Sequence, residues 1–228
     1  MKIHNVEQNS VDWMILRSGK VTASEMDALV TPLGKIKTGD GPRSYLMKKV
    51  AEAWLGGPLP SVQGVFDIDQ GKILEEFARP AFEVESSLEV KTVGFITGDD
   101  ERIGCSPDGL IGGDQGLEIK CPRIENHIRY LMDGVVPPDY VIQVQGSLYV
   151  TGFKRWTFVS YRRRLPMFIL DVEPDEKIQD SIGQALEMFF EFFDEAWVRL
   201  CEINGGPPKR PAISTTATPV AEPMGVTP

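Results

Sequence analysis

The stretch Cys105-Ser-Pro-Asp-Gly-Leu110, followed by Gly116-Leu-Glu-Ile-Lys-Cys-Pro122, contains short runs of β-forming residues on either side of glycines. Gly112-Gly113-Asp114 between them is a turn signal. The pattern predicts a strand over 116–121 that pairs with the chain before the turn. Asp108 lies at the end of the preceding strand, which we expect over 102–106.

Glu118 and Lys120 are two residues apart on the second of these strands. Because side chains alternate along a strand, both point to one face while Ile119 points to the other. A hairpin turn can bring Asp108 beside them, so that two carboxylates and an ammonium group converge. A surface hairpin with an exposed cross-strand charge pair is the alternative interpretation of the same pattern.

Two carboxylates and an ammonium group suit metal-dependent hydrolysis of a phosphodiester. Mg²⁺ prefers carboxylates, water and substrate oxygens, and Mn²⁺ is a possible substitute. We expect Asp108 and Glu118 to hold the metal, and the carbonyl of Ile119 can add a ligand. Lys120 would stabilise negative charge on the attacking hydroxide or in the transition state.

Helix and strand signals alternate along the rest of the chain. Thr22-Ala-Ser-Glu25 is typical of a capping box that opens a helix ending at Val30. Apolar spacing and glycine or proline punctuation predict the remaining elements. We therefore expect an α/β (α+β) fold, with a central mixed sheet flanked by helices. The expected helices are 22–30, 42–55, 67–82 (bent at Pro80), 124–132, 139–151 and 175–201, and the expected strands are 89–97, 102–106, 116–121, 156–162 and 167–172.

The length of 228 residues fits one domain of ordinary size. We assign residues 1–203 to it, and predict that residues 204–228, rich in proline, threonine and glycine, are disordered. The sequence shows neither a long apolar run nor a secretory signal, so we expect a cytoplasmic protein without a membrane span. Three scattered cysteines do not make a disulfide framework or the four ligands of an iron–sulfur cluster.

The net charge of −9, taken alone, argues against a nucleic acid partner, because binding is driven by neutralising phosphates. Carboxylates that hold metal ions add to this negative count, and net charge says nothing about its distribution. Local basic clusters are present, although each can be an ordinary solvated surface. They are Lys35 and Lys37, Lys48 and Lys49, Lys154 and Arg155, and Arg162 to Arg164.

From about Trp13 to Leu200 the chain resembles the phage lambda-type exonucleases, the YqaJ viral recombinase family of the PD-(D/E)xK nuclease superfamily. The resemblance implies a restriction-endonuclease-like core. Five blocks in the order of the family carry it. They are Trp13-Met-Ile-Leu-Arg-Ser-Gly-Lys-Val-Thr-Ala-Ser-Glu25, Gly71-Lys-Ile-Leu-Glu75, Cys105-Ser-Pro-Asp-Gly-Leu110, Leu117-Glu-Ile-Lys-Cys-Pro122 and Gln143-Val-Gln-Gly-Ser-Leu-Tyr-Val150.

The resemblance implies roles for five further residues. Glu75 is similar to an additional acidic residue near the metal, and Gln143 to an active-site glutamine. Arg17 and Ser24 resemble residues that bind a 5′-terminal phosphate, and Ser106 can join them. A helix start also favours an anion at Ser24. The alternatives are a solvated helix position for Glu75, ordinary capping for Ser24 and a turn role for Ser106.

The resemblance further implies a Mg²⁺-dependent exonuclease that digests linear double-stranded DNA from 5′-phosphorylated ends in the 5′-to-3′ direction. It implies a homotrimeric ring around duplex DNA, and a single-strand annealing protein as partner in recombination. Gln145 and Tyr149 match a Q-x-x-x-Y signature, although a core role is equally open for Tyr149. A structure-specific or restriction-type endonuclease remains the alternative, since it would use the same triad.

Overall fold

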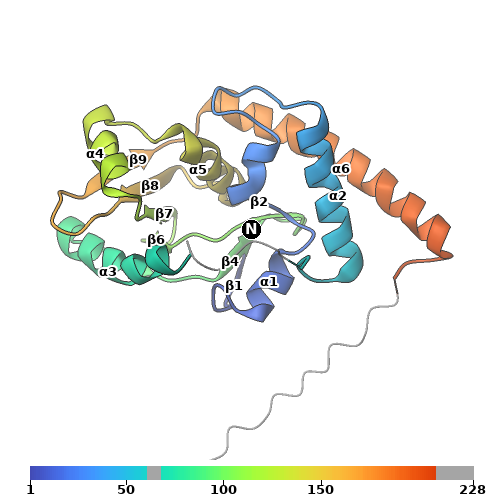
Figure 1. The fold of residues 1–228 in the computed structure, drawn as a ribbon, viewed down its shortest axis with the longest axis horizontal. Helices are drawn as coiled ribbons and strands as arrows, with labels where there is room; N and C mark the ends of the chain where they lie inside the picture. The colour runs from blue at the N-terminus through green and yellow to red at the C-terminus, as the bar shows by residue number, and fades with distance from the viewer. Residues whose placement is uncertain (61–67, 209–228) are drawn as a thin grey trace, which may run out of the picture.

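The computed structural model describes residues 1–60 and 68–208, with side chains from residue 77 onward in the second range (Figure 1). Strands and helices alternate along this part of the chain, which confirms the α/β class. The elements are β1 (Lys2–His4), α1 (Val11–Arg17), β2 (Val21–Thr22), the 3-10 helix η1 (Ala23–Ala28), α2 (Asp40–Leu55), α3 (Ile68–Ser86), β3 (Val90–Lys91), β4 (Phe95–Thr97), β5 (Ile103–Cys105), β6 (Gly109–Ile111), β7 (Gln115–Lys120), α4 (Ile124–Asp133), α5 (Pro138–Thr151), β8 (Arg155–Ser160), β9 (Phe168–Val172) and α6 (Glu176–Asn204).

The strands form two mixed sheets rather than a single central one. The larger has the order β3-β6-β7-β8-β9, with β7 and β8 parallel and the other pairs antiparallel. The smaller has the order β1-β4-β5-β2, with β2 and β5 parallel. A hairpin is present at the predicted turn, because β6 pairs with β7 in the register Gly109↔Leu117. Its first strand is not the expected 102–106, since β5 pairs with β2 and β4 in the smaller sheet.

The single strand expected over 89–97 is wrong. β3 pairs with β6 in the larger sheet, while β4 pairs with β1 and β5 in the smaller one. The chain changes sheets at Gly94, where an added Cβ would lie 1.9 Å from the carbonyl oxygen of Val6. Only glycine allows the two backbone segments to approach this closely.

The helix expected over 22–30 is a 3-10 helix that ends at Ala28. The Thr22 hydroxyl makes no capping bond to the backbone and instead donates to the carboxylate of Glu25, at 3.0 Å. Glu25 is drawn to Lys48 and Lys49 of α2, each at 2.7 Å. Tertiary ion pairs therefore replace the reciprocal capping that the local pattern predicts. The sequence analysis also missed β1, α1, β2 and β6.

Other boundaries differ from the expected ones by a few residues. α3 continues through Pro80 and ends at Ser86 rather than at 82. α6 begins after Asp175, whose carboxylate accepts from the N–H of Ile178 at 3.0 Å, and extends to Asn204. Within the described residues, no helix combines the length and apolar character needed to cross a membrane. The three cysteines are free thiols.

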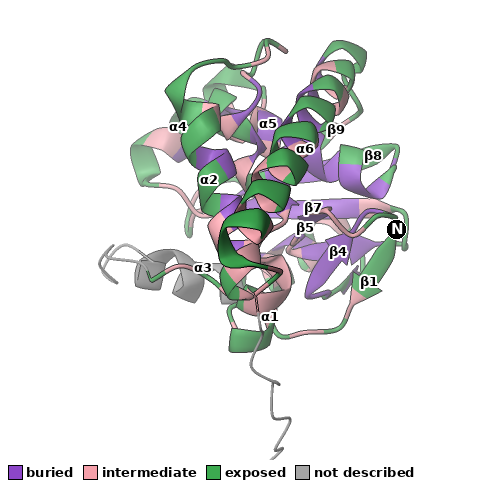
Figure 2. Cartoon of the chain, turned by 90° about the vertical axis from the view of Figure 1, so that its right-hand side faces the viewer, coloured by how far each residue is buried: buried purple, intermediate pink, exposed green. Residues whose placement is uncertain are grey.

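Two hydrophobic clusters cover the two faces of the larger sheet. Trp156 and Phe158 face a large core that is completed by α2, α5 and α6. Leu117 and Ile119 face a smaller core with Ala78 and Phe82 of α3. Figure 2 shows the consequence, since β7 and β8 are buried while α6 is exposed along its outer side. Glu118 and Lys120 therefore project from a fully covered, rigid strand.

Candidate active site

Asp108 lies at the start of β6 and is held directly against β7. Its backbone N–H donates to the carbonyl of Leu117 at 2.9 Å, and its carboxylate Oδ2 accepts from the N–H of Ile119 at 2.6 Å. The Asp108 side chain therefore adds one hydrogen bond to those between β6 and β7, beyond the point where the two backbones pair. This bond fixes Asp108 beside the Glu118–Lys120 segment, as the hairpin pattern predicts.

Glu118 is the centre of a small polar cluster beneath the surface. It is 4% exposed, and its Oε1 lies 2.6 Å from the ammonium nitrogen of Lys120. The side-chain amide of Gln143, from α5, donates to the same oxygen at 2.6 Å. A buried carboxylate requires such partners because burial of an unpaired charge is costly. The structure thus brings together Asp108, Glu118, Lys120 and Gln143.

The carbonyl of Ile119 points toward the Asp108 side of β7. In a strand, the N–H and C=O of one residue point to the same side. The Ile119 N–H donates to Asp108, whereas the next carbonyl, that of Lys120, points to β8 and accepts from Tyr161 at 2.9 Å. The oxygen donors of this centre are therefore two carboxylates and one backbone carbonyl. In the described part of the chain, no three His, Cys, Asp or Glu side chains group closely enough to hold a metal.

Lys120 carries a stable positive charge. Burial alone would lower its pKa, but the adjacent carboxylates of Glu118 and Asp108 outweigh burial and raise the pKa to about 12. The ammonium nitrogen also lies 5.0 Å from the centre of the Tyr140 ring, which favours the cation. Burial and the charge of Glu118 raise the pKa of the nearby Cys105 thiol, so this cysteine is not an activated nucleophile.

Arg17, Ser24 and Ser106 form a second polar cluster, which we call the anion pocket after the role that the family resemblance implies for these residues. The guanidinium of Arg17 donates to the Ser106 hydroxyl at 2.8 Å and to the Ser24 hydroxyl at 3.3 Å. Arg17 ends α1, Ser24 belongs to η1, and Ser106 precedes Asp108 by two residues. Only one residue of the chain therefore separates Ser106 of the anion pocket from Asp108 of the carboxylate centre.

Trp13 supports this pocket and was missed by the sequence analysis. Its indole N–H donates to the Ser106 hydroxyl at 3.1 Å and to the carbonyl of Gly94 at 3.2 Å. The guanidinium carbon of Arg17 lies 4.2 Å from the centre of the indole ring. The spacing from Trp13 to Arg17, one turn of a helix, is the signal that could have linked them.

A buried ion-pair network lies next to the anion pocket. Lys49 is 2% exposed and lies 2.7 Å from Glu25 and 3.0 Å from Glu52. Burial would raise the pKa of Glu25, but Lys49 and Lys48 outweigh burial and lower the pKa to about 2. Glu52 also accepts from the N–H of Gly19 at 3.0 Å, just after Arg17. The network ties the loop behind Arg17 to α2.

Gln145 and Tyr149 do not join these clusters. Glu75 belongs to α3, but its side chain lies outside the described residues. Gln145 bonds to the start of α6, accepting from the N–H of Asp175 at 2.9 Å and donating to the carbonyl of Glu173 at 2.9 Å. Tyr149 is 36% exposed and so is not a core residue.

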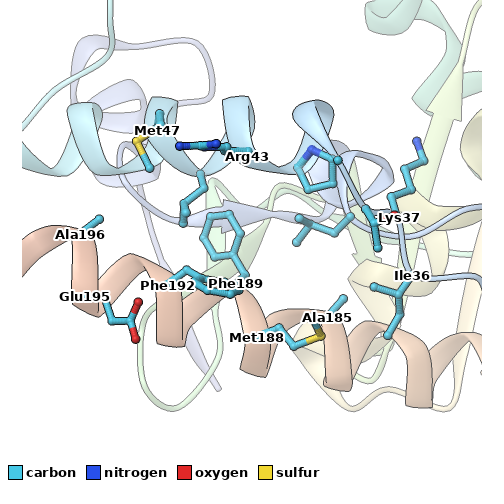
Figure 3. Close-up of a pocket in the computed structure, with 15 residues that line it drawn as sticks. Ile36, Lys37, Arg43, Met47, Ala185, Met188, Phe189, Phe192, Glu195 and Ala196 are labelled. Carbon is cyan, nitrogen blue, oxygen red and sulfur yellow. The ribbon is translucent and has the colours of Figure 1, made fainter.

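A separate apolar cavity of about 620 Å³ lies between α2 and α6 (Figure 3). Met47, Met188 and Phe192 line it, with Arg43 and Glu195 at its edges. None of the residues of the carboxylate centre or the anion pocket contributes to its wall. We therefore place the chemistry at the converging polar groups rather than in this apolar cavity.

Comparison with known proteins agrees with this architecture. The profile of the YqaJ-like viral recombinase domain matches residues 12–154. LHK-Exo, an alkaline exonuclease from Laribacter hongkongensis, was solved in complex with dAMP, and it is 27% identical over 86% of this chain and 98% of that protein, with a TM-score of 0.74.

A phage-related exonuclease from Haemophilus somnus is 17% identical over 79% of this chain and 96% of its own, with a TM-score of 0.57, and shows the same fold. A search among curated proteins gives no match. The matched segment includes the anion pocket, the carboxylate centre and Gln143, and it spans well over half of the sequence. The chain therefore belongs to the YqaJ-like viral recombinase domain family and has the PD-(D/E)xK nuclease fold.

Proposed function

We propose that this protein is a Mg²⁺-dependent exonuclease that digests linear double-stranded DNA from 5′-phosphorylated ends in the 5′-to-3′ direction. The observation that carries the proposal is the short connection between two clusters. Ser106 of the anion pocket and Asp108 of the carboxylate centre are two residues apart on one rigid segment. One cluster suits a terminal phosphate and the other suits the hydrolysis of a phosphodiester nearby.

The carboxylate centre fits a hard divalent cation. Asp108, Glu118 and the carbonyl of Ile119 are the oxygen donors that would hold Mg²⁺, with Mn²⁺ as a substitute. Three protein ligands suit Mg²⁺, which retains several waters and binds substrate oxygens. When bound, such an ion lowers the pKa of water and polarises the phosphoryl group. Glu75 is a further candidate for this site on the basis of the family pattern.

Lys120 and Gln143 act on the charges around this centre. Lys120 is fully protonated at neutral pH, since its pKa is about 12. Its ammonium group can therefore stabilise negative charge on the phosphoryl oxygens and the attacking oxygen. Gln143 fixes the carboxylate of Glu118 through the bond of 2.6 Å, so that the second oxygen keeps a constant orientation.

The anion pocket provides the preference for an end. Arg17 can donate to phosphate oxygens in a bidentate manner, and the hydroxyls of Ser24 and Ser106 surround the same guanidinium. An endonuclease has no need for a pocket specific to a terminal phosphate. The complex of the related LHK-Exo with dAMP supports a nucleotide substrate for this chain.

The wider biological role follows from the family. We propose that double-stranded DNA is the substrate, that three copies form a ring around it, and that the resulting 3′ single strands pass to a single-strand annealing protein for recombination. We also place the protein in the cytoplasm of a bacterium, encoded by a phage or prophage. Chemical cross-linking or sedimentation of the purified chain tests the ring directly.

A digestion assay tests the central proposal. Linear duplex with 5′-phosphate, the same duplex with 5′-hydroxyl and a covalently closed circle are incubated with Mg²⁺, with EDTA as control. We expect the phosphorylated duplex to be digested fastest and the circle to stay intact. Arg17→Ala should remove most of the phosphate preference, about ten- to a hundredfold in rate, as for hydrogen bonds to charged groups. A circle cut as fast as linear DNA would establish the endonuclease alternative.

A further inference from the structure

The loop between β8 and β9 carries three consecutive arginines, Arg162, Arg163 and Arg164. The N–H of Leu165 donates to the carbonyl of Arg162 at 3.2 Å, which closes a turn with the other two arginines at its tip. Both of these side chains are exposed. Arg164 has a φ of 68°, in the left-handed region that glycine or asparagine usually occupies in such turns. Arg164 thus occupies a backbone conformation that favours glycine or asparagine over arginine.

The loop is held firmly at both ends by one buried histidine. The ring of His127, from α4, is 0% exposed and lies 2.7 Å from the hydroxyl of Ser160 and 3.0 Å from the carbonyl of Pro166. Tyr161 and Met167 pack into the smaller core against α3. The guanidinium carbon of Arg163 lies 6.0 Å from the centre of the Phe77 ring of α3. The tip is therefore a preorganised cationic surface.

These arginines have no carboxylate partner in the part of the chain that the structure describes. Elsewhere Arg102 pairs with Asp194, Arg155 with Asp171, and Arg199 with Glu202. The protein has 33 acidic residues against 24 basic ones, so partners are abundant. Among the described residues these like charges have no counter-charge, and they repel one another in the free protein. An external polyanion would remove this repulsion.

The position of the arginine loop beside the carboxylate centre indicates which polyanion it binds. β6 and β8 lie on opposite sides of β7 in the sheet, so the Asp108 segment and the arginine loop flank Glu118 and Lys120. The first loop residue, Tyr161, donates its N–H to the carbonyl of Lys120 at 2.9 Å. In Figure 1 the loop lies at the left, between α3 and α4, and α1 lies on the other side of β7.

The Asp108 segment and the arginine loop also lie close together. Two strand spacings separate β6 from β8, which is about 10 Å. A short stretch of one DNA strand can therefore contact both the carboxylate centre and the arginine loop.

We infer that Arg163 and Arg164 bind phosphates of the digested strand, on the 3′ side of the bond that is cut. The inference rests on the proposed exonuclease function, in which the 5′ end of that strand occupies the anion pocket. The loop would hold the duplex in register while each cleavage occurs. It would contribute to the binding of every DNA sequence equally, because phosphates carry no sequence information.

Fluorescence anisotropy with a 5′-phosphorylated duplex of about 30 base pairs, in Ca²⁺ instead of Mg²⁺ and at several KCl concentrations, tests the contact. We expect R163A/R164A to weaken binding roughly tenfold or more at 0.1 M KCl, and to lower the salt slope by about two. The matched control R155A/R199A removes the same charge from sites paired within the protein and should leave both quantities unchanged. Equal affinity and slope in R163A/R164A and wild type would overturn the inference.

Neutral methylphosphonate linkages identify the strand that is contacted. When they are placed near the 5′ end of the digested strand, they should weaken the binding of the wild-type protein. They should cause little further loss of affinity in R163A/R164A, because the neutral linkages and the substitutions remove the same interaction. If linkages in the complementary strand instead lose their effect on affinity in R163A/R164A, our assignment of the contact to the digested strand is wrong. The digestion assay decides the exonuclease proposal separately, because a protein that binds through the loop but cuts closed circles refutes only that proposal.

Discussion

Single atoms of Glu118 and Ser106 organise the two clusters of the site. Oε1 of Glu118 contacts both Lys120 and Gln143. The hydroxyl of Ser106 receives hydrogen bonds from both Trp13 and Arg17. In each case one oxygen with two donors fixes the orientation of three side chains. Substitutions at this scale should therefore alter chemistry or recognition without altering the fold.

Lys120→Ala should reduce the rate of DNA digestion by roughly a hundredfold or more, because it removes the permanent cation beside the reacting phosphate. The rate constant under saturating DNA is the quantity to measure, together with a melting curve. Lys91→Ala, at an exposed position on β3 of the same sheet, is the matched control and should digest normally. Near-normal digestion by well-folded Lys120→Ala would remove Lys120 from the mechanism. Asp108→Ala and Glu118→Ala are expected to be equally inactive.

Trp13→Phe should weaken the preference for 5′-phosphorylated ends by about fivefold, corresponding to about 1 kcal/mol for a lost hydrogen bond. The ring that supports Arg17 remains, but the donor to Ser106 is lost. The measurement is the ratio of digestion rates for phosphorylated and hydroxyl ends. Trp54→Phe, at a ring that packs on Trp197, should leave the ratio unchanged. A purely structural Trp13 would change thermal stability and leave the ratio as in wild type.

At the scale of elements, η1 and α2 are joined by charges rather than by an apolar contact alone. Glu25 bonds to Lys48 and Lys49 across this junction, and its pKa is lowered to about 2. A carboxyl whose pKa is lower in the folded than in the unfolded state stabilises the fold above its unfolded pKa. This stabilisation is lost as the pH falls from about 4.5 toward 2.

Glu25→Gln should therefore lower the free energy of unfolding at pH 7 by an amount on the order of 3 kcal/mol. The difference in free energy of unfolding between Glu25→Gln and wild type should shrink as the pH falls below about 4.5, because the Glu25 carboxyl of the unfolded wild type then binds a proton. Denaturant unfolding at several pH values measures it. Asp27→Asn, at an exposed position of the same 3-10 helix, is the control. A difference that is constant down to pH 2 would exclude the ion pairs as its cause.

The elements that the sequence predicted well are those with strong local signals. The hairpin around Gly112 and the stripe of α6 follow from turn chemistry and helical period, and both are present. The exchange of sheets at Gly94 was not predictable, because it depends on the approach of Val6 from a distant segment. β1 and β2 have three and two residues, too few for any periodic signal.

The site shows the same division between local and distant information. The E-x-K spacing placed Glu118 and Lys120 on one face, since strand alternation is a local property. The position of Gln143 came from family resemblance, and its bond to Glu118 joins residues 25 apart in sequence. His127, which fixes the arginine loop, carried no local signal, because its partners Ser160 and Pro166 lie 33 and 39 residues further along.

At the scale of the whole molecule, the net charge of −9 is unevenly distributed. The outer side of α6 carries Glu191 and Glu195, beside Asp194 and Glu202, which pair with Arg102 and Arg199. Lys120, Arg17 and the arginine loop belong to the site and its two flanks. A charge distribution of this kind would orient a polyanion toward the site and away from α6. The overall charge is therefore no argument against DNA as substrate.

Removal of residues 209–228 should leave the melting temperature and the digestion rate unchanged. We propose that residues 1–203 are the nuclease domain, and the segment beyond lacks an apolar period that could dock. A chain ending at Pro208 keeps the end of α6, where the N–H of Gly206 donates to the carbonyl of Cys201 at 2.8 Å. A large fall in melting temperature would show that the segment packs on the domain, and loss of partner binding alone would make it a tether.

The segment Ser106-Pro107-Asp108 has a consequence for the product of digestion. It connects the anion pocket to the carboxylate centre, which we propose to bind the terminal phosphate and to cut, and the proline restricts its backbone. Gln8 adds a bond of 2.8 Å to the carbonyl of Pro107, so the segment is held from both sides. In the proposed exonuclease it would therefore set a fixed distance, and every fragment released from a phosphorylated end would have the same length.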